Sequence, residues 1–446
     1  MFSSRLYKLS PIFIQNFLLS SRAFIRKKLR ENKESERLTK ELISHDYNSE
    51  VLKQYQSKTL TTVLTEAQNS IAFYRRFTDD INTFPYIDKA DVNRNKSKFL
   101  SPSKSGVVVK GSTSGTTGAP LTIPQNMQSV VAEQAFINRM MHWAGVGSND
   151  KRAWLRGDMI VPQDQKEGPF WRYSYFENMI LLSSFHLAQK NLDSYLTAMQ
   201  NYGVQAIQAY PSSIVTLAKY LEVNDAYYPG DLKSIITSSE SLSKEDKLLI
   251  EKRFKCTVFD WYGLFERVAA IASCEHGRYH ILTDYSYVEL VPAGKTEDGR
   301  DRAEIIGTNF NNSLYPLIRY KTGDHVVLSE EVTCPCGRIF PIIDSIEGRV
   351  GDYLIGDDGQ KVHILNHIPK GVSGLLATQF VQKEKNKIDI RVVVDQSKFD
   401  NKQRSILINN AKAKLGNSIE FNIEELEELP RTKNGKARQA ICSIEN

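Results

Sequence analysis

Strand-like runs alternate with helical stretches between about residues 105 and 345, and this alternation constrains the fold more than any other feature. The apolar runs QAIQAYP, LKSIITSS and TVFDWYG are separated by SSIVTLAKYLEVN and KEDKLLIEKRF. Such alternation is typical of a layered α/β domain. Because ligands of open α/β sheets bind outside the carboxyl ends of the strands, we expect QAYPS, ITSSES and DWYGLFE to line one crevice.

The texture of the sequence predicts three parts. Residues 1–85 carry charged segments of helical period, residues 86–348 hold the alternating pattern, and residues 349–446 are glycine-punctuated with α+β character. A chain of 446 residues is too long for one core. We therefore predict a helical N-terminal region packed on a large ligand-binding domain, followed by a small mobile domain.

The first thirty residues are apolar and basic. Gln15 and Asn16 interrupt the apolar run, and no small-residue cleavage site follows, so the segment predicts neither a signal peptide nor a membrane span. Two alternatives remain open. The segment forms amphipathic helices packed on the body of the protein, or it forms a foot in peripheral contact with a membrane surface.

Charge and cysteine content limit the partners and the compartment. The formal charge of +6 is modest for this length, and its basic excess is concentrated near the start, so we expect no nucleic-acid partner. Five cysteines in so long a chain argue against a disulfide scaffold and fit a reducing compartment. We expect a cytoplasmic protein.

A loop rich in glycine and hydroxyl groups, GSTSGTTGAP, lies between two β-branched runs. The runs at 107–109 and 121–123 predict two short strands joined by the loop. Gly111, Gly115 and Gly118 let the backbone turn tightly and approach a ligand. Hydroxyls and backbone N–H groups suit a phosphate chain, so a nucleoside triphosphate is favoured over a plain polar turn.

Six motifs occur in order: STSGTTGAP, SSESLS, DWYGLFE, YPLIRYKTGD, GRVGD and LPRTKNGKAR. This order resembles the adenylate-forming superfamily of acyl-CoA synthetases and peptide-synthetase adenylation domains. Within that superfamily the chain is most similar to the phenylacetate–CoA ligase and CapK-type branch, over nearly its whole length. The resemblance implies that ATP and Mg²⁺ convert a small carboxylic acid to an acyl-adenylate with release of pyrophosphate. The acyl group would then pass to coenzyme A, or to an amine in surface-polysaccharide synthesis.

The resemblance also implies roles for the nucleotide-binding residues. The phosphates would be wrapped by Ser112, Thr113, Ser114, Gly115, Thr116, Thr117 and Gly118. The adenine would lie along Ser239, Glu240 and Ser241, with Tyr262 of the Tyr262-Gly263 pair stacked on the base. Asp324 would accept hydrogen bonds from the ribose hydroxyls, and Arg349 would join it at the ribose or a phosphate.

Two residues are expected to act directly in the reaction. Glu266 would bind Mg²⁺, which prefers carboxylate and phosphate oxygens. Lys436 would bridge the carboxylate and the α-phosphate as negative charge shifts in the transition state. The acid pocket is expected near Tyr210 and Pro211, with Trp261 and Phe265 as walls; this composition favours an aromatic or apolar acid.

The sequence departs from the family's pattern at three positions. Leu121 follows Pro120 where the family usually has a lysine. Phe265 occupies the position of a usual threonine, and Gly351 occupies that of a usual aspartate at the joint between the domains. These departures leave two alternatives open, an adenylyl transferase that leaves AMP on its substrate and a non-catalytic nucleotide-binding scaffold.

The cysteine positions predict a structural zinc site. Cys334 and Cys336 form a tight thiolate turn, and Cys274 with His280 lies about sixty residues earlier. Three cysteines and one histidine make a closed tetrahedral Zn²⁺ site, in which His276 is the alternative to His280. Some members of the phenylacetate–CoA ligase branch resemble this pattern and bind zinc.

Overall fold

The computed structural model describes residues 4–102, 106–112, 121–296, 298–349, 353–362, 365, 368–432 and 434–444. The chain forms two compact units. The first comprises Met1–Ala23, Ser148–Val258 and Val350–Asn446, and the second comprises Phe24–Gly147 and Phe259–Arg349. The mixed α/β class expected from the sequence is confirmed. The three domain ranges proposed above stay a prediction.

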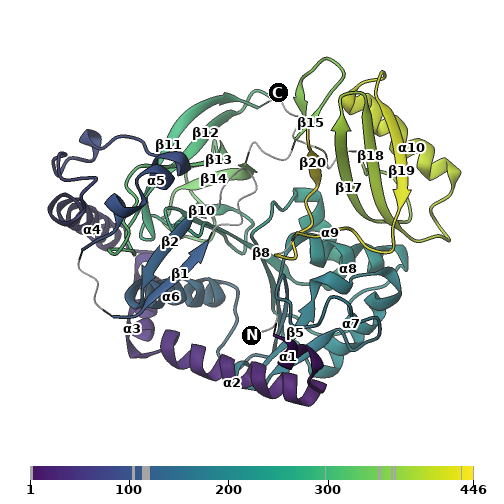
Figure 1. The fold of residues 1–446 in the computed structure, drawn as a ribbon, viewed down its shortest axis with the longest axis horizontal. Coiled ribbons are helices and arrows are strands. Elements are labelled where there is room, and N and C mark those ends of the chain that lie inside the picture. The colour runs from purple at the N-terminus through teal and green to yellow at the C-terminus, as the bar shows by residue number, and fades with distance from the viewer. Residues whose placement is uncertain are drawn as a thin grey trace. The chain divides into compact units, whose positions relative to one another are not determined.

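The first unit contains a mainly parallel sheet of strand order β4-β5-β3-β6-β7. Its strands are β3 (Arg152–Arg156), β4 (Trp171–Ser174), β5 (Met179–Ser183), β6 (Ala206–Ala209) and β7 (Ser234–Ser238), and β4 is the antiparallel edge. Helices α7 (Gln189–Tyr202), α8 (Pro211–Val223) and α9 (Lys244–Phe254) follow β5, β6 and β7. Figure 1 labels strand β5 and the helices α7, α8 and α9. Every residue of β5 and β7 is buried, as in parallel strands covered on both faces.

The C-terminal part of the first unit has its own sheet and core. Its strand order is β19 (Glu420–Glu425), β18 (Lys387–Val394), β17 (Leu375–Glu384) and β20 (Ala440–Cys442). Helix α10 (Asn401–Leu415) contributes Leu407, Ala411 and Leu415 to the core. A short hairpin joins β15 (Leu354–Ile355) to β16 (Lys361–Val362).

The N-terminal helices α1 (Arg5–Leu9) and α2 (Ile12–Arg30) begin in the first unit. The Tyr7 hydroxyl donates to the Ile160 carbonyl at 2.7 Å, and Asn16 Oδ1 accepts from the Tyr173 backbone N–H at 3.0 Å. Through these contacts, the start of the segment packs against the first unit. No helix in the described ranges is long and apolar enough to cross a membrane.

The second unit combines helices with an antiparallel sheet. Its helices are α3 (Lys33–His45), α4 (Ser49–Ser70), α5 (Lys89–Arg94) and α6 (Met127–Trp143). The strand order is β11 (Ser286–Lys295), β12 (Asp301–Asn309), β13 (Tyr320–Leu328), β14 (Ile342–Arg349), β10 (Tyr279–Ile281), β9 (Ala270–Ser273) and β8 (Thr257–Gly263). The chain enters this unit within β8. Short 3₁₀ helices span Ile81–Thr83, Lys96–Phe99, Tyr175–Glu177 and Ser184–His186 across the two units.

The two strands predicted beside the glycine-rich loop are present as a hairpin in the second unit. Strand β1 (Val108–Ser112) pairs antiparallel with β2 (Thr122–Asn126), from Val108 opposite Asn126 to Ser112 opposite Thr122. Both strands start one residue later than expected. They end three residues later than expected, because the antiparallel pairing continues for five residue pairs. The strand-to-strand connection is therefore confirmed, whereas residues 113–120 of the loop lie outside the described residues.

Candidate functional site

Three strand ends of the first unit bring polar and aromatic side chains together. Tyr210 caps α8 directly after β6, with Pro211 at the first helical turn, where proline is favoured. Ser239 follows β7 with φ of +72°, so the chain turns sharply there. Arg156 ends β3, donates to Ser239 Oγ at 2.7 Å, and lies 5.0 Å from the Tyr210 ring centroid.

Lys436 lies at this cluster of strand ends. Its Nζ donates to the Ser239 carbonyl at 2.7 Å and lies 5.8 Å from the Tyr210 ring centroid. The two predicted site residues Ser239 and Tyr210 thus contact the predicted C-terminal lysine. These three residues and Arg156 form what we call the lysine cluster.

Two glycines allow the loop that carries Lys436 to approach the strand ends. A Cβ on Gly157 would overlap the Asn434 carbonyl, and a Cβ on Gly435 would overlap Gly157 and would meet Ser184 Oγ at 2.6 Å. Gly435 also has φ of +73°, a conformation that side chains disfavour. The close approach therefore depends on glycine on both sides.

A polar network around Arg431 anchors the same loop. Arg431 donates to the Gly435 carbonyl at 2.9 Å and to Ser213 Oγ at 3.2 Å, and it interacts electrostatically with Glu240. Glu240 accepts from the Ser212 backbone N–H at 2.9 Å, at the start of α8, where a helix favours negative charge. Burial raises the pKa of Glu240, opposed by the Ser212 hydrogen bond and by Arg431.

The sequence reasoning did not single out Arg156 or Arg431. Arg431 belongs to the LPRTKNGKAR motif, and this position could have identified it as a site residue. Arg156 is the last residue of a strand, the position at which site residues were sought in neighbouring strands. Ser241 is described after β7, but no contact of it enters the lysine cluster.

The predicted ribose and magnesium residues lie in the second unit. The Tyr262 hydroxyl donates to Asp324 Oδ2 at 2.7 Å, and the Asp324 backbone N–H donates to the Thr322 hydroxyl at 3.0 Å. Asp324 on β13 lies opposite Arg349 on β14 in the strand register; only the backbone of Arg349 is described. The structure therefore brings Tyr262 and Asp324 into direct contact.

Glu266 is a buried carboxylate close to this pair in the sequence. It is 2% exposed, and the Tyr320 hydroxyl donates to its Oε1 at 3.4 Å. A carboxylate is a ligand type that Mg²⁺ prefers. Gly263 ends β8, where a Cβ would meet Trp261 Nε1 at 2.7 Å.

Phe265 lies against the first strand of the glycine-rich hairpin. A Cβ on Gly111 would overlap the Phe265 ring, so the two residues are complementary in size. The rings of Trp261 and Tyr285 form a T-shaped, edge-to-face pair with centroids 6.5 Å apart. Tyr210 and Pro211 belong to the first unit and Trp261 and Phe265 to the second, and their grouping into one acid pocket stays a prediction.

Four predicted metal ligands converge in the second unit. Cys274, His280, Cys334 and Cys336 place one ligand atom each within 4.8 Å of all the others. Cys274 Sγ lies 3.6 Å from Cys334 Sγ, and Cys336 Sγ lies 3.5 Å from His280 Nε2. His276, the predicted alternative, is not part of this group, which we call the Cys₃His cluster.

The surroundings of the Cys₃His cluster suit metal ligation. His280 Nδ1 lies 3.4 Å from the Phe340 carbonyl; a proton on Nδ1 leaves Nε2 facing Cys336 as a ligand. Burial lowers the pKa of His280 to about 4, so the imidazole is neutral near pH 7. Burial raises the pKa of Cys274 and of Cys334, so a bound cation would have to displace thiol protons.

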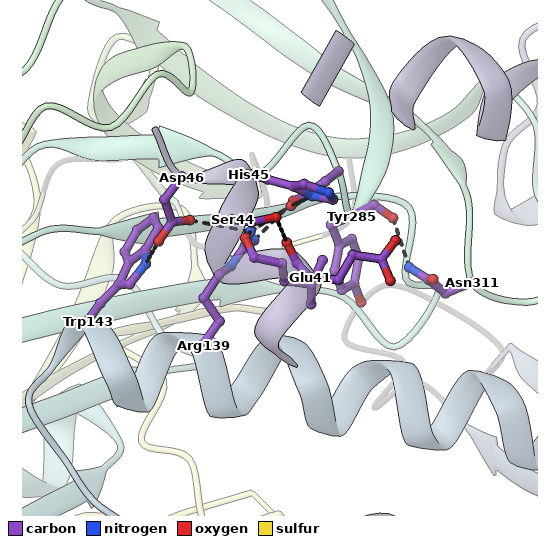
Figure 2. A network of polar contacts seen from close by, with 10 residues as sticks. Glu41, Ser44, His45, Asp46, Arg139, Trp143, Tyr285 and Asn311 are labelled. Carbon is purple, nitrogen blue, oxygen red and sulfur yellow. Dashed lines mark hydrogen bonds and ion pairs between the residues drawn. The ribbon is translucent and has the colours of Figure 1, made fainter. Parts of the chain in front are cut away.

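Figure 2 shows a network of polar contacts around Arg139 of α6 and His45 of α3. Arg139 forms a two-pronged ion pair with Asp284, at 2.6 and 3.0 Å, and His45 Nδ1 lies 2.9 Å from the same carboxylate. Trp143 donates to Asp46 Oδ2 at 2.7 Å, and its ring centroid lies 5.9 Å from that of His280. Helices α3 and α6 are thereby connected to the Cys₃His cluster.

The sequence of this chain is similar to CapK proteins. Residues 354–443 match the model of the family described as the CapK C-terminal domain. Over 98% of its length the chain is 26% identical to Protein CapK of Staphylococcus aureus, of which the match covers 99%.

Solved structures give the fold class. A 2-hydroxyisobutyryl-CoA ligase in the postadenylation state, in complex with R3-HIB-AMP, aligns with a TM-score of 0.65 and 17% identity over 90% of this chain and 91% of that one. An open conformation of this ligase with 2-HIB-AMP and CoA aligns with a TM-score of 0.52 and 18% identity, over 88% and 92% of the two chains. The chain therefore has the fold of the adenylate-forming ligases. It is similar to CapK over nearly its whole length, and its C-terminal part matches the CapK C-terminal domain.

Proposed function

We propose that this protein is an adenylate-forming ligase similar to phenylacetate–CoA ligase, which activates a small carboxylic acid with ATP. A carboxylate oxygen of the acid attacks the α-phosphorus, the bond from that phosphorus to the pyrophosphate leaving group breaks, and an acyl-adenylate forms. An acceptor then takes the acyl group and releases AMP. The acceptor is coenzyme A or an amine in surface-polysaccharide synthesis, and the reaction runs in the cytoplasm.

The observation that carries this proposal is the position of Lys436. Its ammonium group lies 2.7 Å from the Ser239 carbonyl, at the carboxyl end of β7. A lysine held at the strand ends can stabilise the negative charge that develops on the carboxylate and the α-phosphate. The anchoring of its loop by Arg431 and by two close-packed glycines supports a fixed position rather than a mobile surface charge.

Arg156 adds a second cation to the lysine cluster. Because it lies over Tyr210 and donates to Ser239, it can bind an oxygen of the acid or of the α-phosphate from the same side as Lys436. The positive charge of Arg156 would compensate for the lysine that is replaced by Leu121 after the glycine-rich loop.

The second unit supplies the residues proposed for the rest of the nucleotide. The Asp324 carboxylate, oriented by Tyr262, is a suitable acceptor for ribose hydroxyls. Glu266 is the residue proposed to hold Mg²⁺, which would neutralise phosphate charge when bound. Asp324, Tyr262 and Glu266 are all retained, which favours catalysis over the non-catalytic scaffold.

The proposal is tested by measuring pyrophosphate release from ATP and Mg²⁺ over a panel of carboxylic acids, with mass spectrometry of the products. We expect release with one class of acid, an acyl-adenylate without acceptor, and a thioester or amide with it. A stable AMP adduct on the substrate would instead favour the adenylyl transferase. ATP binding without release over the whole panel would favour the scaffold.

We also propose that the Cys₃His cluster holds a structural Zn²⁺. Three thiols and a neutral imidazole within 4.8 Å of one another would supply all four ligands of a tetrahedral Zn²⁺, which would leave no position for substrate. The cluster ties the turn after β9 to the segment between β13 and β14. Its role is therefore to stabilise the second unit.

Zinc removal has a specific expected result. Metal analysis of protein prepared without chelator should find about one equivalent of zinc, and Cys336→Ser should lose it with a lower melting temperature. Because protons compete for the thiolates, acidification should also release the metal. Cys256→Ser, a thiol outside the cluster, is the control and should keep its zinc. Metal-free protein of equal stability would contradict the assignment.

A further inference from the structure

The N-terminal helices expose an apolar face. Leu6 is 77% exposed, Leu9 84%, Phe13 72% and Phe17 68%. At about 100° per residue, Phe13, Phe17 and Phe24 fall in one narrow stripe of α2, and Phe24 is exposed as well. We call the four residues Leu6, Leu9, Phe13 and Phe17 the N-terminal apolar face.

The buried side of the same helices contains three polar side chains. Gln15, Asn16 and Ser20 are 3%, 7% and 3% exposed. Gln15 Oε1 accepts from Arg172 Nε at 2.5 Å, and Asn16 and Ser20 accept from backbone N–H groups of Tyr173 and Tyr175 at 3.0 Å each. These side chains satisfy N–H groups at the edge strand β4.

The docked side therefore mixes these polar groups with the buried apolar residues Leu19 and Ala23. Unlike the usual amphipathic surface helix, the segment also leaves large apolar side chains exposed. Gln15 and Asn16, which interrupt the apolar run in the sequence, serve the docked side. The phenylalanines are therefore outward-facing because of the docking geometry, and contiguous exposed apolar surface of this kind marks an interaction site.

The charge of the segment identifies the partner. Residues 1–30 contain no Asp or Glu. Their basic residues are Arg5, Lys8, Arg22, Arg26, Lys27, Lys28 and Arg30. Exposed aromatic and aliphatic side chains together with lysine and arginine suit the interface of an anionic bilayer. A second copy of this chain would present the same positive charge and be repelled.

We propose that the N-terminal apolar face inserts into the headgroup region of an anionic phospholipid membrane. Helices α1 and α2 would lie in the membrane plane, with Phe13 and Phe17 in the acyl boundary and the basic side chains at the lipid phosphates. This attachment is peripheral, and it does not depend on which acid or acceptor the enzyme uses.

The test is flotation of the full-length protein with lipid vesicles. We expect binding to vesicles of phosphatidylcholine mixed with phosphatidylglycerol, weakened by added salt, and little binding to phosphatidylcholine alone. The double variant Phe13→Ser/Phe17→Ser should lower the bound fraction by about tenfold with an unchanged melting temperature, because both side chains are mostly exposed.

A matched control is Leu248→Ser/Val332→Ser, which removes exposed apolar side chains elsewhere and should float like the wild type. Wild-type protein that fails to float with either vesicle, or a Phe13/Phe17 variant that floats equally well, would overturn the proposal. A dimer in size-exclusion chromatography that this variant converts to monomer, without vesicle binding, would identify a second copy as the occupant instead.

Discussion

Lys436→Ala is expected to slow pyrophosphate release by about 10²–10³-fold, the usual cost of removing one preorganised group that stabilises developing charge. Two contacts of the side chain are the Ser239 carbonyl and the Tyr210 ring, both at the lysine cluster. The loop itself is held by Arg431 and by the Gly157–Gly435 approach, neither of which needs the Lys436 side chain. The variant should therefore keep its melting temperature and its affinity for ATP.

The measurement is the rate of pyrophosphate release with the acid identified by the panel, together with a separate ATP titration. Lys190→Ala is the matched control, because Lys190 forms an exposed ion pair with Glu427, at 3.1 Å, and its loss should leave the rate unchanged. Acyl transfer from preformed acyl-adenylate should be less affected than adenylation. Wild-type rates of release in Lys436→Ala would remove the lysine from the mechanism.

The parts of the fold that local pattern determines could be predicted from the sequence. The hairpin beside the glycine-rich loop follows from two β-branched runs, and the parallel sheet follows from the alternation of apolar and amphipathic segments. The Cys₃His cluster was predictable because cysteine and histidine are rare enough for their spacing to be informative.

Other features depend on contacts that no local pattern shows. Arg139 and Asp284 are 145 residues apart, and neither has neighbours in the sequence that mark it as buried. In the sequence, Gln15 and Asn16 only interrupt an apolar run. Their role is seen in the structure, where they accept hydrogen bonds from Arg172 and Tyr173 of the edge strand β4. Arg156 became a candidate only when three separate strand ends met at Ser239.

The buried ion pair of Arg139 and Asp284 should carry the largest stability effect in the second unit. Arg139 is 1% exposed, Asp284 is fully buried, and the Asp284 carboxylate contacts both Arg139 and His45. Arg139→Met keeps much of the side-chain volume but removes the guanidinium, so the buried carboxylate keeps His45 and loses its permanent positive charge. We expect a loss of about 3–5 kcal/mol in the free energy of unfolding, measured by urea denaturation at neutral pH.

The pH dependence of this loss separates charge from packing. In the wild type, burial alone would raise the pKa of Asp284, but attraction to Arg139 and hydrogen bonds from His45 and Arg139 outweigh it and hold the pKa below its usual value. This stabilisation is present above the unfolded pKa, about 3.9, and is lost as the pH falls through the folded pKa. In Arg139→Met, burial without the guanidinium raises the pKa of Asp284. As the pH falls, protonation of Asp284 therefore removes the buried charge and reduces the destabilisation of the variant.

The stability difference between wild type and Arg139→Met should therefore shrink on acidification towards about pH 4. Arg300→Ala is the control for a solvent-exposed ion pair, with Asp344, and should cost about 1 kcal/mol or less. The double variant Arg139→Met/Asp284→Leu should cost less than the sum of its single changes, because it removes both charges together. A difference that is constant over this pH range would mean that Arg139 acts through packing against Phe136, Trp143 and Phe340 rather than through its charge.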